Sequence, residues 1–358
     1  MERIARTEVL VIATQGPGSG DERRIVTLLG EGGTEVHGFD RGHKIRSGLA
    51  LLRRLVGPER PRIAVIEGTG LGAGLPALLA RLVRRTPFVI STGDAVGPFF
   101  ALRGPVSGLV GAVYERALYR AAAGVIGWTP YLAGRALTLG ARRAITAENW
   151  AEGSFDADAR ERLRGAHGIP EQAVVFGIAG SLTWSRRRGY CYGLELVRAA
   201  RSCSRPDLRV LIVGDGDGRD RLEREAGGDQ RVIFTGRVPS AEVPGLLSAM
   251  DVVSLPQSRD GVGAFRYTIK LSEYLASGAR IVTGRLPFAY DLSDAPITRL
   301  AGAMPWNDAY VAALADFMET ARAAPDRAPC VLPAFDRDRQ QVRVRAFIDD
   351  VLEELHSD

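Results

Sequence analysis

Short apolar runs alternate with longer amphipathic stretches along the first half of the chain. Runs rich in β-branched residues predict strands at residues 8–13, 35–39, 62–67, 88–91, 124–127 and 144–146. Between them, apolar residues recur every three to four positions and predict helices at residues 21–29, 45–55, 75–84 and 106–122. Strands that alternate with helices are typical of a parallel sheet with crossover helices. The pattern therefore predicts one doubly wound α/β domain.

A polar interruption separates this half from a second stretch of the same kind. Residues 150–172 carry blocks of charge and several glycines, which predict a short helix and an interdomain linker. Strands are then expected at residues 173–180, 209–214, 231–235, 252–255 and 280–283, with helices at 194–202, 219–225, 241–249, 269–277 and 337–355. We therefore predict an N-terminal domain over residues 1–160, a C-terminal domain over 161–330 and a terminal helical segment over 331–358.

The composition fits two soluble globular domains and excludes disordered and fibrous classes. The 358 residues are 46 % hydrophobic and 25 % charged, with a net charge of +5. Only Lys44 and Lys270 are lysines, so guanidinium groups carry nearly all of the positive charge. That excess suits phosphate-bearing ligands or an anionic membrane surface, and GC-rich coding explains it equally well.

Cysteine usage and the N-terminus indicate a location in the cytoplasm. Cys191, Cys203 and Cys330 are scattered without paired spacing, which indicates neither a disulfide framework nor a zinc site. The apolar run at residues 9–13 is too short for the core of a signal peptide. Prolines, glycines and Arg103 interrupt the longest apolar stretch, so no spanning helix is expected, while contact with a membrane face stays open. No nucleic-acid partner is expected, and the oligomeric state is not indicated.

Short motifs follow one another in a fixed order through the second half. Gly-Ser-Leu at residues 180–182 and Arg-Arg-Arg-Gly at 186–189 precede a strand that leads into Val-Gly-Asp-Gly-Asp-Gly at 213–218. Val-Ile-Phe-Thr-Gly-Arg-Val at 232–238 and Ile-Lys-Leu-Ser-Glu-Tyr-Leu-Ala-Ser-Gly at 269–278 come after it. In this order they resemble the nucleotide-sugar domain of GT-B glycosyltransferases of the retaining family four.

The resemblance implies a GT-B architecture, in which two Rossmann-like domains face a cleft, the first on the acceptor side and the second holding the donor. It implies a retaining glycosyltransferase of the hexosyltransferase class, which moves a sugar from a nucleotide-diphosphate sugar to a small-molecule or lipid-linked acceptor. No cofactor and no metal ion are expected. The resemblance also implies that the donor phosphate takes the acceptor proton, so no protein nucleophile is required and the protein supplies electrostatic stabilisation. The terminal helix resembles the element that crosses back to the first domain.

The resemblance gives three catalytic candidates. Arg188 precedes Gly189 where the family has the lysine that neutralises the donor diphosphate, and a guanidinium can pair with two phosphate oxygens. Lys270 is expected to face the same diphosphate, with an ion pair to Glu273 as the alternative. Asp94 stands where the family has a histidine after the fourth strand, so it is expected to accept a sugar hydrogen bond or a hydroxyl proton.

Further positions are expected to bind the donor. Glu273 matches the second glutamate of the family's Glu-x7-Glu motif, whose carboxylate accepts hydrogen bonds from the ribose hydroxyls. The first glutamate falls at Phe265, so Asp260 in the upstream Asp-Gly-Val-Gly turn is the expected substitute. The other expected donor contacts are Gly16, Gly18, Gly180, Ser181, Arg187, Arg237, Val238, Gly261 and Gly263.

Alternative functions fit parts of the sequence. Gly68-x-Gly70 follows a strand, with Asp94 further on, as in NAD-dependent Rossmann oxidoreductases, but that fingerprint normally opens its domain. Asp215-Gly-Asp217 resembles the metal-binding Asp-x-Asp of the other major glycosyltransferase fold, although its position indicates a turn. A catalytically altered sugar-nucleotide-binding protein is the non-enzymatic alternative, because two family positions differ.

The donor base, the donor sugar and the acceptor are not indicated by the sequence. Residues 93–107 are the expected acceptor loop. Its aromatic residues Phe99 and Phe100 are expected to pack into the core rather than to line a pocket, since aromatic side chains are mostly buried.

Overall fold

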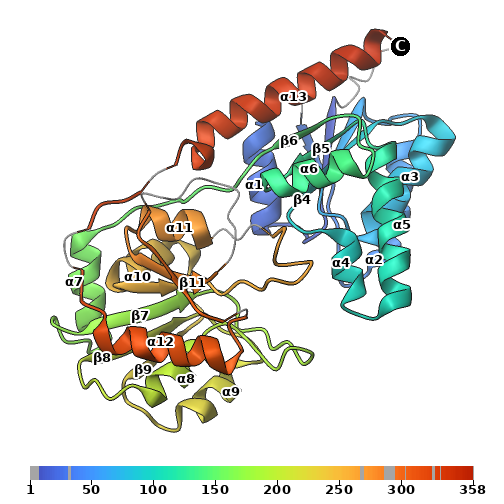
Figure 1. Cartoon of the computed structure of the whole chain (residues 1–358). Coiled ribbons are helices and arrows are strands. Elements are labelled where there is room, and N and C mark those ends of the chain that lie inside the picture. The colour runs from blue at the N-terminus through green and yellow to red at the C-terminus, as the bar shows by residue number, and fades with distance from the viewer. Residues whose placement is uncertain are drawn as a thin grey trace. The chain divides into compact units, whose positions relative to one another are not determined.

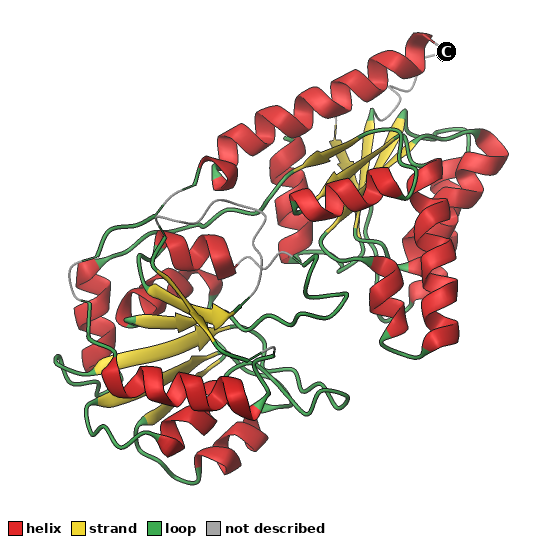
Figure 2. Ribbon diagram, in the orientation of Figure 1, coloured by secondary structure: helices red, strands yellow, loops and turns green. Residues whose placement is uncertain are grey.

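Each half of the chain folds into a six-stranded parallel sheet covered by helices (Figures 1 and 2). The structure is a computed structural model that describes residues 8–30, 34–266, 270–285, 295–302, 304–324, 327–330 and 332–357. The described residues within 1–149, 265–267 and 333–358 form a first unit, and those within 150–264 and 268–332 form a second. The predicted class of two doubly wound α/β domains is confirmed.

The first sheet has the strand order β2-β1-β3-β4-β5-β6. From β2 onward, the chain crosses the sheet in one direction, and the helices of these crossovers include α2, α3, α5 and α6. Neighbouring helices of this set pack together, whereas α1, which leads from β1 to β2, packs against α13. Strands β1, β3 and β4 are buried along their whole length, which explains their mainly apolar sequences. In chain order the elements are β1 (Val9–Ala13), α1 (Gly20–Leu29), β2 (Thr34–Val36), α2 (Lys44–Val56), β3 (Ile63–Glu67), α3 (Leu71–Arg84), β4 (Phe88–Thr92), α4 (Val96–Ala101), α5 (Pro105–Ala121), β5 (Gly124–Gly127), α6 (Pro130–Thr138), β6 (Ala144–Thr146) and, near the C-terminus, α13 (Arg337–Ser357).

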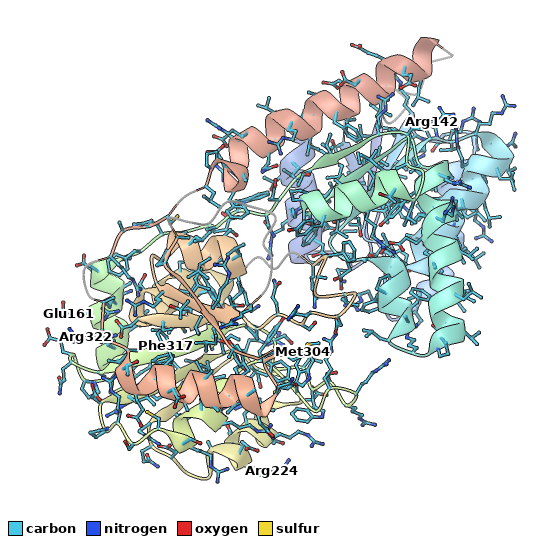
Figure 3. The ribbon with its side chains drawn as sticks, in the orientation of Figure 1. Arg142, Glu161, Arg224, Met304, Phe317 and Arg322 are labelled. Atoms are coloured by element: carbon cyan, nitrogen blue, oxygen red, sulfur yellow. The ribbon has the colours of Figure 1, made fainter. Side chains whose placement is uncertain are left out.

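The second sheet has the strand order β12-β11-β10-β7-β8-β9. Phe317 of α12, labelled in Figure 3, packs against its core. The Phe317 ring meets that of Phe176 in β7 edge to face, with ring centroids 5.9 Å apart. Its elements are α7 (Ala157–Ala166), β7 (Val174–Ala179), α8 (Leu194–Ser202), β8 (Leu208–Val213), α9 (Arg219–Ala226), β9 (Val232–Gly236), α10 (Val243–Ala249), β10 (Val252–Ser254), α11 (Lys270–Ala276), β11 (Arg280–Gly284), β12 (Ile297–Leu300) and α12 (Asp308–Thr320).

The pattern of the sequence does not predict four of these elements. Helix α4 has six residues and contains a glycine and a proline, and α6 begins at a proline, so neither shows a long apolar period. Strand β12 and helix α12 follow β11 in a region without predicted elements. The predicted start of a helix at residue 269 lies outside the described residues.

Helix α7 packs within the second unit through a buried charge cluster. Arg160 and Arg164 of this helix donate to the fully buried Asp251 at 2.6 and 2.7 Å, and Asp251 also accepts from the backbone N–H of Val175 at 2.8 Å. A buried carboxylate is tolerated only when it is paired in this way. Of the helices in the described part of the chain, none is long and apolar enough to cross a membrane.

Candidate functional site

The second sheet presents most of the predicted donor residues at one edge. Gly180, Gly214 and Arg237 directly follow β7, β8 and β9, and Asp260 lies in the loop after β10. Because the strands are parallel, their carboxyl ends share this edge. The direction of strand addition reverses between β7 and β10, and open parallel sheets bind ligands at such a reversal. This edge is therefore the candidate donor site.

The glycine-rich turn after β8 lets two backbone segments touch. A Cβ on Gly214 would lie 1.9 Å from the carbonyl oxygen of Gly180, so only glycine fits there. The backbone N–H of Leu182 donates to the carbonyl of Asp215 at 3.0 Å, and that of Gly218 donates to the carbonyl of Leu182 at 2.9 Å. The turn thus braces the segment that begins at Gly180.

The carboxylates of the Asp-x-Asp sequence are used inside this turn. Asp217 Oδ1 accepts from the backbone N–H of Trp184 at 2.7 Å, and Asp215 Oδ1 accepts from the N–H of Gly216 at 2.8 Å. Across the described residues, no three His, Cys, Asp or Glu side chains gather as a group that could hold a metal ion. Asp215 thus stabilises its own turn, and Asp217 joins the turn to the segment that begins at Gly180.

Arg188 is turned toward Asp260, whereas its neighbour Arg187 is exposed. The arginines lie in a tight turn that an antiparallel bridge closes at residues 185 and 190. Arg188 Nη2 donates to Asp260 Oδ2 at 2.6 Å, and its guanidinium lies 5.2 Å from the ring centroid of Trp306. The structure therefore joins a predicted catalytic residue to a predicted donor-binding residue.

Asp260 is held in its charged form. Its Oδ1 accepts from the backbone N–H groups of Val262 and Gly263 at 3.1 and 2.9 Å. Burial acts to raise the pKa of Asp260, but these hydrogen bonds, the Ser258 side chain and the Arg188 guanidinium hold it below its usual range. A Cβ on Gly263 would lie 2.1 Å from the Ser258 carbonyl oxygen, which explains the second glycine of Asp-Gly-Val-Gly.

Lys270 lies close to the end of β7. Its Nζ is 4.7 Å from the ring centroid of Tyr192, and a Cβ on Gly180 would approach that Nζ to 2.8 Å. Glu273 follows one helical turn later. Burial raises the pKa of Glu273, Lys270 lowers it and Glu152 raises it further. Gly180, Lys270 and Glu273 are thus brought to the same end of the sheet.

The remaining predicted residues of this edge have few contacts. The Ser181 hydroxyl shares a hydrogen bond of 2.7 Å with that of Thr183, and Ser181 is exposed. Arg237 and Gly261 are also exposed, and Val238 is partly buried. Their part in donor binding stays a prediction.

Phe265, at the position of the missing first glutamate, belongs to the first unit. Its carbonyl oxygen accepts from the Thr129 hydroxyl at 3.1 Å, and its ring lies 5.1 Å from the Arg135 guanidinium.

The first unit has a pocket of about 570 Å³ at its own reversal point, between β1 and β3. The residues that follow β1, β3 and β4 line it, together with cations from neighbouring loops. The lining that bears on function is Thr14, Gln15, Asp21, Arg41, Lys44, Glu67, Gly68, Gly70, Asp94, Phe99, Phe100, Arg103, Trp128 and Arg266.

Glu67 is a buried carboxylate at the base of this pocket, and the sequence analysis did not single it out. It is 1 % exposed, and its Oε2 accepts from Arg24 Nη1 at 2.8 Å. Its Oε1 accepts from the Ser91 hydroxyl and from Trp128 Nε1, both at 3.0 Å. Burial raises the pKa of Glu67 to about 7, against the effect of Arg24. A charged residue that ends an apolar strand is the signal that could have identified it.

Asp94 follows β4 and lines the same pocket. Its Oδ1 lies 3.2 Å from Arg266 Nε without the alignment of a hydrogen bond. Burial raises the pKa of Asp94, and Arg266 lowers it. Asp21, another lining carboxylate, also has a pKa raised by burial, and Asp94 adds to that increase.

Gly16 and Gly18 follow β1 and use their N–H groups within the loop. Gly16 N–H donates to the carbonyl of Ala13 at 3.1 Å, and Gly18 N–H donates to Glu22 Oε1 at 2.9 Å. Both glycines have positive φ angles, +98° and +71°, which explains the residue type. Contact of these glycines with a donor stays a prediction.

The expectation that both aromatic residues of residues 93–107 pack into the core is wrong for Phe99. Phe99 is 43 % exposed and lines the pocket. Phe100 is partly buried against Tyr114, with ring centroids 6.4 Å apart, and also lines the pocket. The short helix α4 turns Phe99 outward, because Val96 and Gly97 of that helix are the buried ones.

Two doubly wound parallel domains, each with candidate residues at the carboxyl ends of its strands, define the GT-B class. Comparison with known families agrees with the fold. A profile described as "Glycosyl transferase 4-like domain" matches residues 2–147, and one described as "Glycosyl transferases group 1" matches residues 173–318. The chain belongs to this glycosyltransferase family, and the dehydrogenase alternative is excluded. The glycines at 68 and 70 instead form the turn from β3 to α3.

Among curated proteins, the chain is similar to 2-deoxystreptamine glucosyltransferase of Streptomyces kanamyceticus, with 33 % identity over 107 residues, 29 % of this chain and 27 % of the relative. It is also similar to the GDP-mannose-dependent alpha-(1-6)-phosphatidylinositol monomannoside mannosyltransferase of Mycolicibacterium smegmatis, with 31 % identity over 137 residues, 36 % of this chain and 34 % of the relative. The chain thus matches about a third of the length of these relatives.

Solved structures share the fold over nearly the whole chain. HepE of Anabaena in complex with UDP-glucose has a TM-score of 0.64 at 16 % identity, covering 97 % of this chain and 99 % of that one. Sucrose-phosphate synthase of Thermosynechococcus elongatus has a TM-score of 0.64 at 13 % identity, covering 98 % of both chains.

Proposed function

We propose that the chain transfers a sugar, with retention, from a nucleotide-diphosphate sugar to a hydroxyl of a small-molecule or lipid-linked acceptor. The donor binds at the β7/β10 edge of the second unit, and the acceptor binds in the pocket of the first. The observation that carries the proposal is that Lys270 Nζ lies against the backbone of Gly180, with Arg188 paired to Asp260 at the same edge, where parallel sheets bind ligands.

We call the β7/β10 edge of the second unit the donor edge, and each group there has a proposed task. Arg188 and Lys270 stabilise the charge that develops on the leaving diphosphate, and fixed cations do so without reorganisation. Asp260 holds the Arg188 guanidinium in place, and Glu273 accepts hydrogen bonds from the two ribose hydroxyls. Gly180 leaves room for the phosphates beside Lys270 Nζ. The donor phosphate takes the acceptor proton, so no protein nucleophile is required.

The similar proteins leave the donor base open. HepE is described with UDP-glucose, and the mycobacterial relative is described as GDP-mannose-dependent. We further propose that the reaction needs neither a cofactor nor a metal ion. The hydrogen bonds that Asp215 and Asp217 accept from the backbone N–H groups of Gly216 and Trp184 support that proposal. The described cysteines are all free thiols, which supports a reducing, cytoplasmic location.

A binding screen with the purified chain tests this function. UDP, GDP, their glucose and mannose conjugates and NAD are titrated by calorimetry, and we expect one nucleotide-sugar pair to bind and NAD not to bind. Transfer is then measured with an aminocyclitol and with an inositol phospholipid, with and without a chelator. Binding of the donor without hydrolysis or transfer would instead indicate a sugar-nucleotide-binding protein, and restoration of activity by a divalent ion after chelation would overturn the metal-independent reaction.

A further inference from the structure

Helix α3 carries its large apolar side chains on the outside. Its buried face consists mainly of small residues, among them Ala73, Ala77 and Ala80. The opposite face exposes Leu71, Leu75, Leu79 and Leu82 by 40, 45, 47 and 80 %. An ordinary surface helix has the reverse arrangement, with apolar side chains toward the core and polar ones toward water. The sequence of α3 therefore provides a second apolar face that the sheet does not use.

The helices on either side of α3 continue this face. Helix α5 exposes Val106, Leu109, Val110 and Val113 by 56 to 75 %, at helical spacing on the side opposite its buried residues. Helix α2 exposes Ile45 by 82 % and Leu49 by 53 %. Helix α3 packs against both α2 and α5 (Figure 1). We call the exposed apolar residues of these three helices the outer apolar face.

The helices that carry the outer apolar face expose charge of one sign. In helices α2 to α5, whose residues the structure describes completely, the only acidic residue is Glu115. Glu115 is fully buried and accepts from Arg135 at 2.9 and 2.6 Å. The exposed basic residues of these helices are Lys44, Arg46, Arg53, Arg84, Arg116 and Arg120.

An open groove of about 1030 Å³ lies along the outer side of α2. Its lining combines the apolar Ile45 and Leu49 with the cationic Lys44, Arg46 and Arg53. Arg41 and Lys44 line both this groove and the pocket of the first unit. The two sites therefore share a boundary.

We propose that the outer apolar face docks on the surface of an anionic lipid bilayer. Exposed Leu, Ile and Val side chains gain free energy when they enter the boundary between headgroups and acyl chains, and arginines beside them pair with anionic headgroups. Their apolar stems add to the buried area. A second copy of the chain fits less well, because a twofold contact would bring two sets of cations together.

The docking proposal rests on the outer apolar face and does not depend on the proposed transfer reaction. Where the proposed function also holds, the shared Arg41 and Lys44 place the mouth of the acceptor pocket beside the lipid surface. That placement favours an acceptor with a lipid anchor over a freely diffusing one.

Flotation of the whole chain with vesicles tests the docking. We expect binding to vesicles of phosphatidylcholine mixed with phosphatidylglycerol, little binding to phosphatidylcholine alone, and release by salt. Lys44→Glu with Arg46→Glu removes two cations from α2, and each lost cation should weaken partitioning about fivefold. Leu79→Gln with Leu82→Gln should weaken it about tenfold or more by removing buried apolar area.

Matched controls lie elsewhere on the first unit. Arg142→Glu reverses an exposed charge just before β6, at the amino-terminal edge of the sheet (Figure 3), and Val342→Gln makes a polar change at a residue of α13 that is 70 % exposed. Both should bind vesicles like the unchanged chain, and circular dichroism confirms that every variant is folded.

Three results would overturn the docking. The first is that the chain does not float with anionic vesicles at low salt. The second is that the control variants lose as much vesicle binding as the variants of the outer apolar face. The third is that the chain does not bind vesicles but forms a concentration-dependent dimer that the leucine variants abolish. The last result assigns the face to a second copy of the chain. Calorimetric donor binding by the same preparation is independent of vesicles, so failure of docking and failure of the proposed function remain distinguishable.

Discussion

Each unit has an aspartate beside an arginine at the carboxyl ends of its strands. The two pairs differ in how many hydrogen bonds the aspartate carboxylate accepts. Asp260 accepts from Arg188 at 2.6 Å and from two backbone N–H groups, and its pKa is lowered. Asp94 lies 3.2 Å from Arg266 Nε without an aligned hydrogen bond, and burial raises its pKa. A fully bonded aspartate positions its arginine, whereas an under-bonded one is available to a ligand.

The surroundings of the two pairs extend this difference. The donor edge of the second unit adds Lys270 and a glycine turn that packs backbone against backbone, which suits a charged diphosphate. The pocket of the first unit adds Asp21 and Glu67, whose pKa values burial raises, which suits acceptor hydroxyls.

The largest effect is expected at the donor edge itself. Arg188→Ala removes the cation that we propose stabilises the leaving diphosphate, and kcat/KM for transfer should fall about 10²–10³-fold, as for the loss of one transition-state donor. Arg186→Ala is the matched control, because this arginine of the same turn is exposed and is not an expected donor contact, and it should change kcat/KM less than threefold. Equal losses in the two variants would remove the distinction between the arginines of this turn.

A smaller effect is expected in the pocket of the first unit, where we propose that the acceptor binds. Asp94→Asn retains the shape of the side chain and removes its charge, so the KM for the acceptor should rise about tenfold, the cost of one hydrogen bond to a charged group. The KM for the donor should stay unchanged. Initial rates over a matrix of donor and acceptor concentrations measure both constants. If only the KM for the donor changed, Asp94 would not bind the acceptor.

The two aspartates should also differ in stability. Asp260→Asn should lower the free energy of unfolding by about 1 kcal/mol at neutral pH, because the variant loses the hydrogen bonds and the ion pair that stabilise the charged form of Asp260 in the folded state. The contribution of Asp260 is present above its ordinary pKa of 3.8 and is lost as the pH falls through the lower folded-state value. Asp94→Asn should be neutral or stabilising, because the folded state holds that charge unfavourably. Urea unfolding at neutral and acidic pH compares them, and destabilisation by both variants alike contradicts the contrast.

Much of the fold follows from the sequence because the central strands of both sheets are buried on both faces. All strands of the first sheet and all but β12 of the second are expected from short β-branched runs, and parallel pairing follows from the intervening helices. Helix α4 is not expected, since its six residues contain Gly97 and Pro98 and are too few for an apolar period.

The site is less predictable than the fold, because its geometry depends on contacts distant in the sequence. The motifs place Arg188, Asp260 and Lys270 at one edge, but the ion pair between Arg188 and Asp260 joins residues 72 positions apart. Burial raises the pKa of Glu67, and the hydrogen bond from Trp128, which acts to lower it, comes from a residue 61 positions away that no local pattern brings to the site.

Glu67 gives the smallest expected effect in the comparison between the carboxylates of the two units. Its titration can be followed through the Trp128 indole, which lines the same pocket. Trp128 Nε1 donates to Glu67 Oε1 at 3.0 Å, so the indole N–H resonance of Trp128 should shift with a midpoint near pH 7. Glu67→Gln should abolish that shift while Ser91→Ala retains it. The folded chain keeps a proton on Glu67 that the unfolded chain releases above its ordinary pKa of 4.5, so the free energy of unfolding should fall as the pH rises from 4.5 to about 7. An indole resonance that stays constant across this range would show that Arg24 holds Glu67 charged throughout. Glu67 would then be a satisfied carboxylate like Asp260, and the distinction of the first pocket would rest on Asp94 and Asp21 alone.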